Sequence, residues 1–134
     1  MCFTPAVSFL TFAIEIVMAG WILRRDPKNK VYRLSAIILL FLGLYQLSEF
    51  MICSAGNELF WGRMAFIFYT TLPALGVHWA YALKKSNKII WPVHLISGVF
   101  ILYAIIMPNF VTLAECGRFF VKTMHNLVPP VYLA

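Results

Sequence analysis

Charged residues are scarce in this chain. They make up 12% of its 134 residues, about half of the fraction usual in soluble domains. Acidic side chains are the rarest of them, with 5 Asp and Glu residues against 11 Lys and Arg residues. By contrast, 62% of the chain is hydrophobic, and its mean hydropathy is +0.83. These proportions argue against a water-soluble domain and indicate an integral membrane protein, whose first partner is the lipid bilayer.

Recognisable catalytic patterns are missing as well. The sequence contains no G-x-x-x-x-G-K-[ST], no G-x-G-x-x-G, no G-x-S-x-G and no H-E-x-x-H. Its three cysteines, Cys2, Cys53 and Cys116, lack the spacing of a zinc site. Cys53 and Cys116 fall on the same predicted side of the membrane, so a disulfide between them and two free thiols both stay open. The motifs give no argument for an enzyme and identify no cofactor.

Four apolar stretches are each long enough to form a transmembrane helix, because about 20 apolar residues cross a hydrocarbon core of about 30 Å. They comprise residues 6–23, 31–53, 59–83 and 89–107. Basic residues gather in the connections 24–33 and 84–88, which the positive-inside rule places in the cytoplasm. Topology therefore explains the net charge of +6, and nucleic acid is not expected as a partner. We predict an all-α polytopic bundle in the cell membrane, with its N-terminus outside.

The C-terminal part of the sequence has a different character. Residues 110–127 mix apolar and charged side chains, which predicts an interfacial helix on the outer side of the membrane. The final VPPVYLA has the apolar character of the start of a further crossing. We therefore expect this chain to be the N-terminal part of a larger bundle, completed by further membrane helices or by an oligomeric partner.

Four polar side chains inside the predicted crossings form the candidate site. They are Glu15, Gln46, Glu49 and Arg63. Gln46 and Glu49 share one stripe of their helix, and this stripe must face protein or water because lipid satisfies neither group. A rise of about 1.5 Å per residue places Arg63 at the depth of Glu49, which predicts an ion pair. Glu15 lies near mid-membrane, where an ionised acid costs roughly 2.5 kcal/mol or more, and Gln46 is its expected hydrogen-bond partner.

This polar cluster has two interpretations. Acids and an amide in the interior of a bundle bind a cation or a polar ligand, or relay protons. Alternatively, the same side chains clamp helices together, at about 0.6–2 kcal/mol for each hydrogen bond. Glu15 lacks an obvious cationic partner, and it is therefore the acid that most favours a functional role.

His78 and His94 lie at similar distances on either side of the 84–88 connection. If the flanking helices are antiparallel neighbours, the two imidazoles lie at the same depth. Two facing imidazoles hold a haem or a metal ion. The alternative is that the two are unrelated, one packing beside Trp79 and the other beside Trp91.

Three segments resemble an uncharacterised family of small bacterial multi-pass membrane proteins: MCFTPAVSF, the LRR after the first crossing, and LLFLGLYQLSEF. Members of this family begin MCFS-x-x-ASF and carry G-x-QQ-x-x-E in the second helix. Here Thr4 and Tyr45 replace a family serine and glutamine, whereas Gln46 and Glu49 match. The resemblance covers the first two crossings. It implies a larger helical bundle and no assigned reaction.

A second segment, FWGRMAFIFYTTLPALGVHWAYAL, resembles the membrane-embedded sensory region that precedes some bacterial histidine kinases. The shared features are an early Trp and Arg, a central Pro and a later His, but the chain carries no kinase domain. We therefore predict a sensory or small-ligand-binding membrane module. A transporter or proton-conducting subunit that uses Glu15, and a haem-binding redox protein that uses His78 and His94, are the alternatives.

Overall fold

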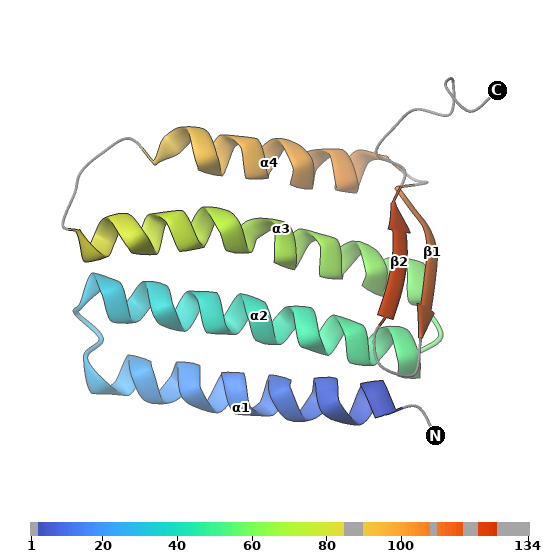
Figure 1. The fold of residues 1–134 in the computed structure, drawn as a ribbon, viewed down its shortest axis with the longest axis horizontal. Helices are drawn as coiled ribbons and strands as arrows, with labels where there is room; N and C mark the ends of the chain where they lie inside the picture. The colour runs from blue at the N-terminus through green and yellow to red at the C-terminus, as the bar shows by residue number, and fades with distance from the viewer. Residues whose placement is uncertain (1–2, 85–89, 108–109, 117–120, 126–134) are drawn as a thin grey trace.

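Four antiparallel helices lie side by side in one layer, in the order of the sequence (Figure 1). The computed structural model describes residues 3–84, 90–107, 110–116 and 121–125. The helices are α1 (Phe3–Arg25), α2 (Lys30–Ser54), α3 (Glu58–Leu83) and α4 (Trp91–Ile106). Each packs mainly against the next helix in the chain. The four predicted helices are thus present, within a few residues of the predicted bounds.

The turns between the helices follow from local chemistry. Asn29 caps α2, since its side chain accepts a hydrogen bond from the backbone N–H of Val31 at 3.0 Å. Gly56, between α2 and α3, has φ of 69°, which a residue with a side chain rarely adopts. Of the predicted connection 84–88, only Lys84 belongs to the described residues. The connection between α1 and α2 and the C-terminal end of α3 lie at the same end of the layer (Figure 1).

The predicted interfacial helix over 110–127 is wrong for the described part of that segment. Two short strands, β1 (Val111–Cys116) and β2 (Val121–His125), pair there as an antiparallel hairpin that lies across the end of the helix layer opposite the two connections (Figure 1). In the register, Glu115 is opposite Lys122. Mixed polar and apolar residues suit an alternating strand as well as an amphipathic helix, and the β-branched Val and Thr residues in this segment favour the strand. The final residues 126–134, expected to begin a further crossing, lie outside the described residues.

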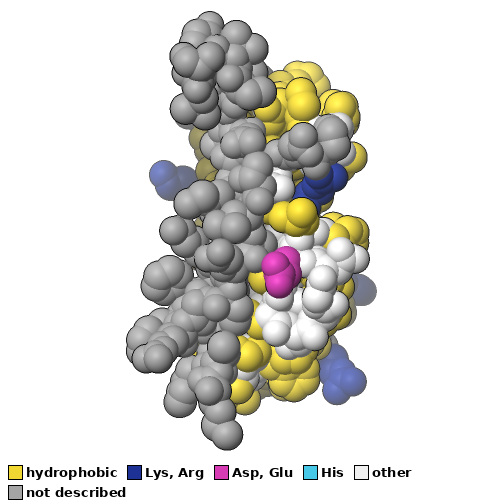
Figure 2. Space-filling view, turned by 90° about the vertical axis from the view of Figure 1, so that its right-hand side faces the viewer, with side chains coloured by type: hydrophobic (Ala, Val, Ile, Leu, Met, Phe, Trp, Pro, Cys, Tyr) yellow, Lys and Arg dark blue, Asp and Glu magenta, His cyan; other side chains and the backbone are white. Residues whose placement is uncertain are grey.

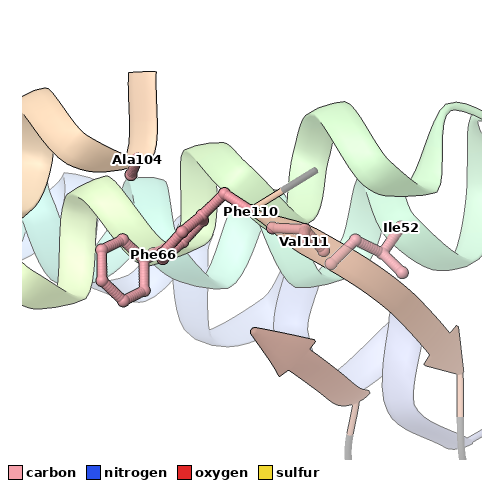
Figure 3. Close-up of a cluster of buried hydrophobic side chains, with 5 residues drawn as sticks. All are labelled: Ile52, Phe66, Ala104, Phe110 and Val111. Carbon is pink, nitrogen blue, oxygen red and sulfur yellow. The ribbon is translucent and has the colours of Figure 1, made fainter. Parts of the chain in front are cut away.

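The hairpin is anchored by a cluster of buried hydrophobic side chains. The cluster consists of Ile52, Phe66, Ala104, Phe110 and Val111, and Figure 3 shows how α2, α3, α4 and β1 each contribute to it. The Phe66 and Phe110 rings meet edge to face, with centroids 4.5 Å apart. Phe110, only 1% exposed, therefore fixes the start of β1 between α3 and α4.

The hairpin end of the molecule is seen in Figure 2, where hydrophobic side chains and uncharged atoms make up most of the described surface. Glu58, which is exposed, opens α3 at this end. An acid in the first turn of a helix interacts favourably with the positive end of the helix dipole. The exposed Glu58 at this end is therefore stabilised by α3 itself.

Small residues fill the contacts between helices. The buried positions include Ala19, Ala36, Ser48, Ala65, Ala74, Ser97 and Ala104, each 8% exposed or less. Large apolar side chains instead point outward, and Val17, Trp21 and Trp91 are 71%, 65% and 70% exposed. Among the described residues, two helices are apolar enough by length and composition to cross a membrane: α1, over Pro5–Arg25, and α2. The apolar α4 has 16 residues and is shorter.

Candidate functional site

Glu49 is the centre of a hydrogen-bonded group between α1 and α2. Tyr45, one turn earlier on α2, donates its hydroxyl to Glu49 Oε1 at 2.7 Å. Ser8 on α1 donates to Glu49 Oε2 at 3.3 Å, and Ser8 itself is 4% exposed. Each carboxylate oxygen of Glu49 therefore has a hydroxyl donor. These bonds fix the position of the acid and join the two helices.

Glu15 lies in the same α1–α2 contact but is not satisfied. Its Oε2 atom is buried and has no hydrogen-bond partner among the described residues. The carboxyl lies against Gly43 of α2, because a Cβ atom added to that glycine would be 3.5 Å from Glu15 Oε2 and 3.4 Å from a ring carbon of Phe12. A buried carboxyl oxygen without a donor is costly, and it can accept a proton, a cation or a ligand's donor group.

The predicted partners of these two acids are elsewhere. No ion pair joins Glu49 to Arg63, although the structure describes both residues; Arg63 Nη2 instead donates to the Met107 carbonyl at 3.0 Å. Gln46 is half-buried and has no hydrogen bond to Glu15 in the described part of the chain. The residue count considers only depth, and depth does not determine the direction in which a side chain points. Arg63 thus binds the C-terminal end of α4, where a cation is favourable.

His78 and His94, by contrast, are brought together. Their rings meet edge to face, with centroids 5.5 Å apart and an interplanar angle of 79°. Next to His78, Trp79 Nε1 donates to Ser35 Oγ of α2 at 2.8 Å, which fixes this part of α3 against α2. The two rings are thus in contact, as expected for antiparallel neighbouring helices, and their role in holding a haem or a metal ion stays a prediction.

Cys53 is disulfide-bonded, so the free-thiol alternative is wrong for this residue. The side chains of Cys2 and Cys116 lie outside the described part of the structure, and the Cys53–Cys116 pairing stays open. A disulfide at the C-terminal end of α2 agrees with an oxidising compartment on the hairpin side of the molecule.

Two residues of the site, Tyr45 and Ser8, were not expected from the sequence. Tyr45 lies four residues before Glu49, and this spacing on a helix was a usable signal. Ser8 lies 41 positions from Glu49, and nothing in the sequence connected the two. Comparison with protein-family models, with curated proteins and with solved structures found no match for this chain.

Proposed function

We propose that the chain is a multi-pass membrane protein in which all four helices cross the bilayer. The support is the packing of the helices, because most buried positions on them are small residues and many large apolar side chains are exposed. In a soluble protein the long apolar helices are buried in the core, but only 11% of the apolar window of α1 and 22% of that of α2 are buried here. Membrane helices pack in this manner because lipid, unlike water, solvates large apolar side chains.

The same proposal extends to α3 and α4, because they belong to the same layer of helices. The 26 residues of α3 are about 39 Å long, enough to span the hydrocarbon core, and they lie alongside α2. The shorter α4 lies alongside α3 (Figure 1). If α1 and α2 cross the bilayer, α3 and α4 lie beside them within it. The basic connections then face the cytoplasm, and the N-terminus and the hairpin face outside.

Within this membrane layer, we infer that the α1–α2 contact is the binding site of a sensory or small-ligand-binding module. One observation carries this inference: among the described residues, Glu15 presents a buried carboxyl oxygen without a donor, whereas Glu49 has a donor at each oxygen. The ligand class that satisfies Glu15 is a small cation or a group with a hydrogen-bond donor.

Thermal unfolding of the detergent-purified chain, followed by tryptophan fluorescence, tests the site against a panel of alkali cations and small primary amines. A ligand of Glu15 should stabilise the wild type and should stabilise Glu15→Gln much less. Asp26→Asn, which removes an acid in the first basic connection, is the matched control and should respond like the wild type. Equal stabilisation of Glu15→Gln and the wild type, or no stabilisation of either, would contradict the proposal.

The same unsatisfied oxygen also favours a second function, a proton-conducting or transport subunit. Vesicles with an internal pH-sensitive dye distinguish the two, because a proton pathway through Glu15 should be lost in Glu15→Gln. A pH difference that decays no faster than in empty vesicles would leave ligand binding as the function. A visible spectrum of the same sample with a Soret band would instead indicate a haem at His78 and His94.

A further inference from the structure

The contact between His78 and His94 lies in a different part of the molecule from the acids of the α1–α2 contact. His78 is on α3, His94 is on α4, and both side chains are half-buried. We propose that these two imidazoles bind one divalent transition-metal ion that joins α3 to α4. This proposal is independent of the ligand site at Glu15.

The distance between the rings carries the proposal. A zinc–imidazole bond is about 2.0–2.1 Å long and follows the lone pair of the ring nitrogen, so two imidazoles on one tetrahedral ion have centroids about 5 Å apart. The observed separation is 5.5 Å. The proposal requires each ring to turn about its side-chain bonds until a nitrogen of each faces the common ion.

The donor set determines the class of metal. Neutral imidazole suits Zn²⁺, Cu²⁺ and Ni²⁺, whereas Mg²⁺ and Ca²⁺ require oxygen ligands. Among the described residues, no group of three His, Cys, Asp or Glu side chains could hold an ion. The ion would therefore keep open coordination positions for water or for a small ligand, as exchangeable metal sites do.

The surroundings both support and oppose binding. The hydrogen bond from Trp79 to Ser35 fixes the part of α3 that carries His78 against α2. Because this backbone is already ordered, metal binding loses less conformational entropy. Lys30, at the start of α2, acts electrostatically on His78 and repels a cation. Lys30 is exposed, so water and salt screen this repulsion. We expect binding that is moderate in strength and reversible.

Competition between the metal-free full chain and a chromogenic chelator for Zn²⁺ tests the proposal. The wild type should take up one ion per chain, and His78→Ala and His94→Ala should each weaken binding at least tenfold. The chain has one further histidine, and His125→Ala is therefore the matched control, with unchanged affinity. Circular dichroism should show the same helix content in all four proteins.

If an alanine variant does not fold, His78→Gln and His94→Gln replace it, since glutamine keeps a polar side chain of similar size. Unchanged Zn²⁺ affinity in the His78 and His94 variants would overturn the proposal. So would an equal loss in His125→Ala. Light scattering completes the test, because an increase in mass with Zn²⁺ would show that the ion joins two copies instead of α3 and α4 of one chain.

Discussion

Glu15 and Glu49 lie in the same contact between α1 and α2, but their carboxyl groups have different surroundings. Glu49 is held by hydroxyls from its own helix and from the neighbouring one, and it needs no cation in contact. Glu15 lies against a glycine and has a buried oxygen for which the described part of the chain offers no partner. At the residue scale, the difference comes from whether a hydroxyl is within reach, since both acids are in the same helix contact.

The phenol of Tyr45 should therefore contribute to stability through its hydroxyl. Tyr45→Phe keeps the ring but removes the donor to Glu49, and we expect a loss of about 1–2 kcal/mol in the free energy of unfolding. Chemical denaturation in detergent measures this loss. Tyr32→Phe, on the same helix and without a side-chain hydrogen bond in the described structure, should be neutral. Equal effects of the two substitutions would contradict the role of the hydroxyl.

Glu49 and Arg63 should behave as independent residues. Because Glu49 binds hydroxyls and Arg63 binds the Met107 carbonyl, the losses from Glu49→Gln and Arg63→Gln should add within about 0.5 kcal/mol. A double-mutant cycle from unfolding in detergent measures the sum. A double variant that is more stable than the sum predicts would restore the ion pair expected from the sequence.

At the scale of elements, Gly43 determines how closely α1 and α2 approach. An alanine Cβ there would make ordinary contacts at 3.4–3.6 Å, so Gly43→Ala should fold normally. Gly43→Leu would push into Glu15 and Phe12, and we expect a loss of about 1–3 kcal/mol. Gly20→Leu is the control, since nothing lies within 4 Å of a Cβ at that position. A neutral Gly43→Leu in thermal unfolding would show that the α1–α2 contact is looser than described.

The hairpin depends on one aromatic side chain. Phe110→Ala would leave a cavity between Phe66 and Tyr103, whose rings both contact Phe110, and should cost about 3 kcal/mol or more. Phe100→Ala removes a ring that is 45% exposed and should cost much less. Denaturation in detergent compares the two. Similar costs would mean that the cluster at the hairpin end does not hold β1 in place.

At the scale of the whole molecule, the proposed orientation is open to direct test. Single cysteines at Lys28 and Asn57 lie at opposite ends of the layer, both in exposed turns. A membrane-impermeant maleimide applied to intact cells should label Asn57→Cys, and it should label Lys28→Cys only after lysis. The parent chain gives the background from the native cysteines. The reverse pattern would invert the orientation, and labelling of both from outside would contradict a crossing by α2.

The sequence alone determined the four helices and their approximate ends. Helix length, apolar composition and turn residues such as Asn29 act locally, and a connected antiparallel pair of helices fixes relative depth. That is why the contact of His78 with His94 could be anticipated.

Only the tertiary structure decided which polar groups are in contact, and that residues 111–116 and 121–125 form strands. The direction of a side chain around a helix, and the pairing of one extended segment with another, depend on contacts far apart in the chain. Glu49 thus binds Ser8 instead of Arg63. Residues 111–116 pair with 121–125 as strands because Phe110 and Val111 find an apolar site on α2, α3 and α4, which composition does not reveal.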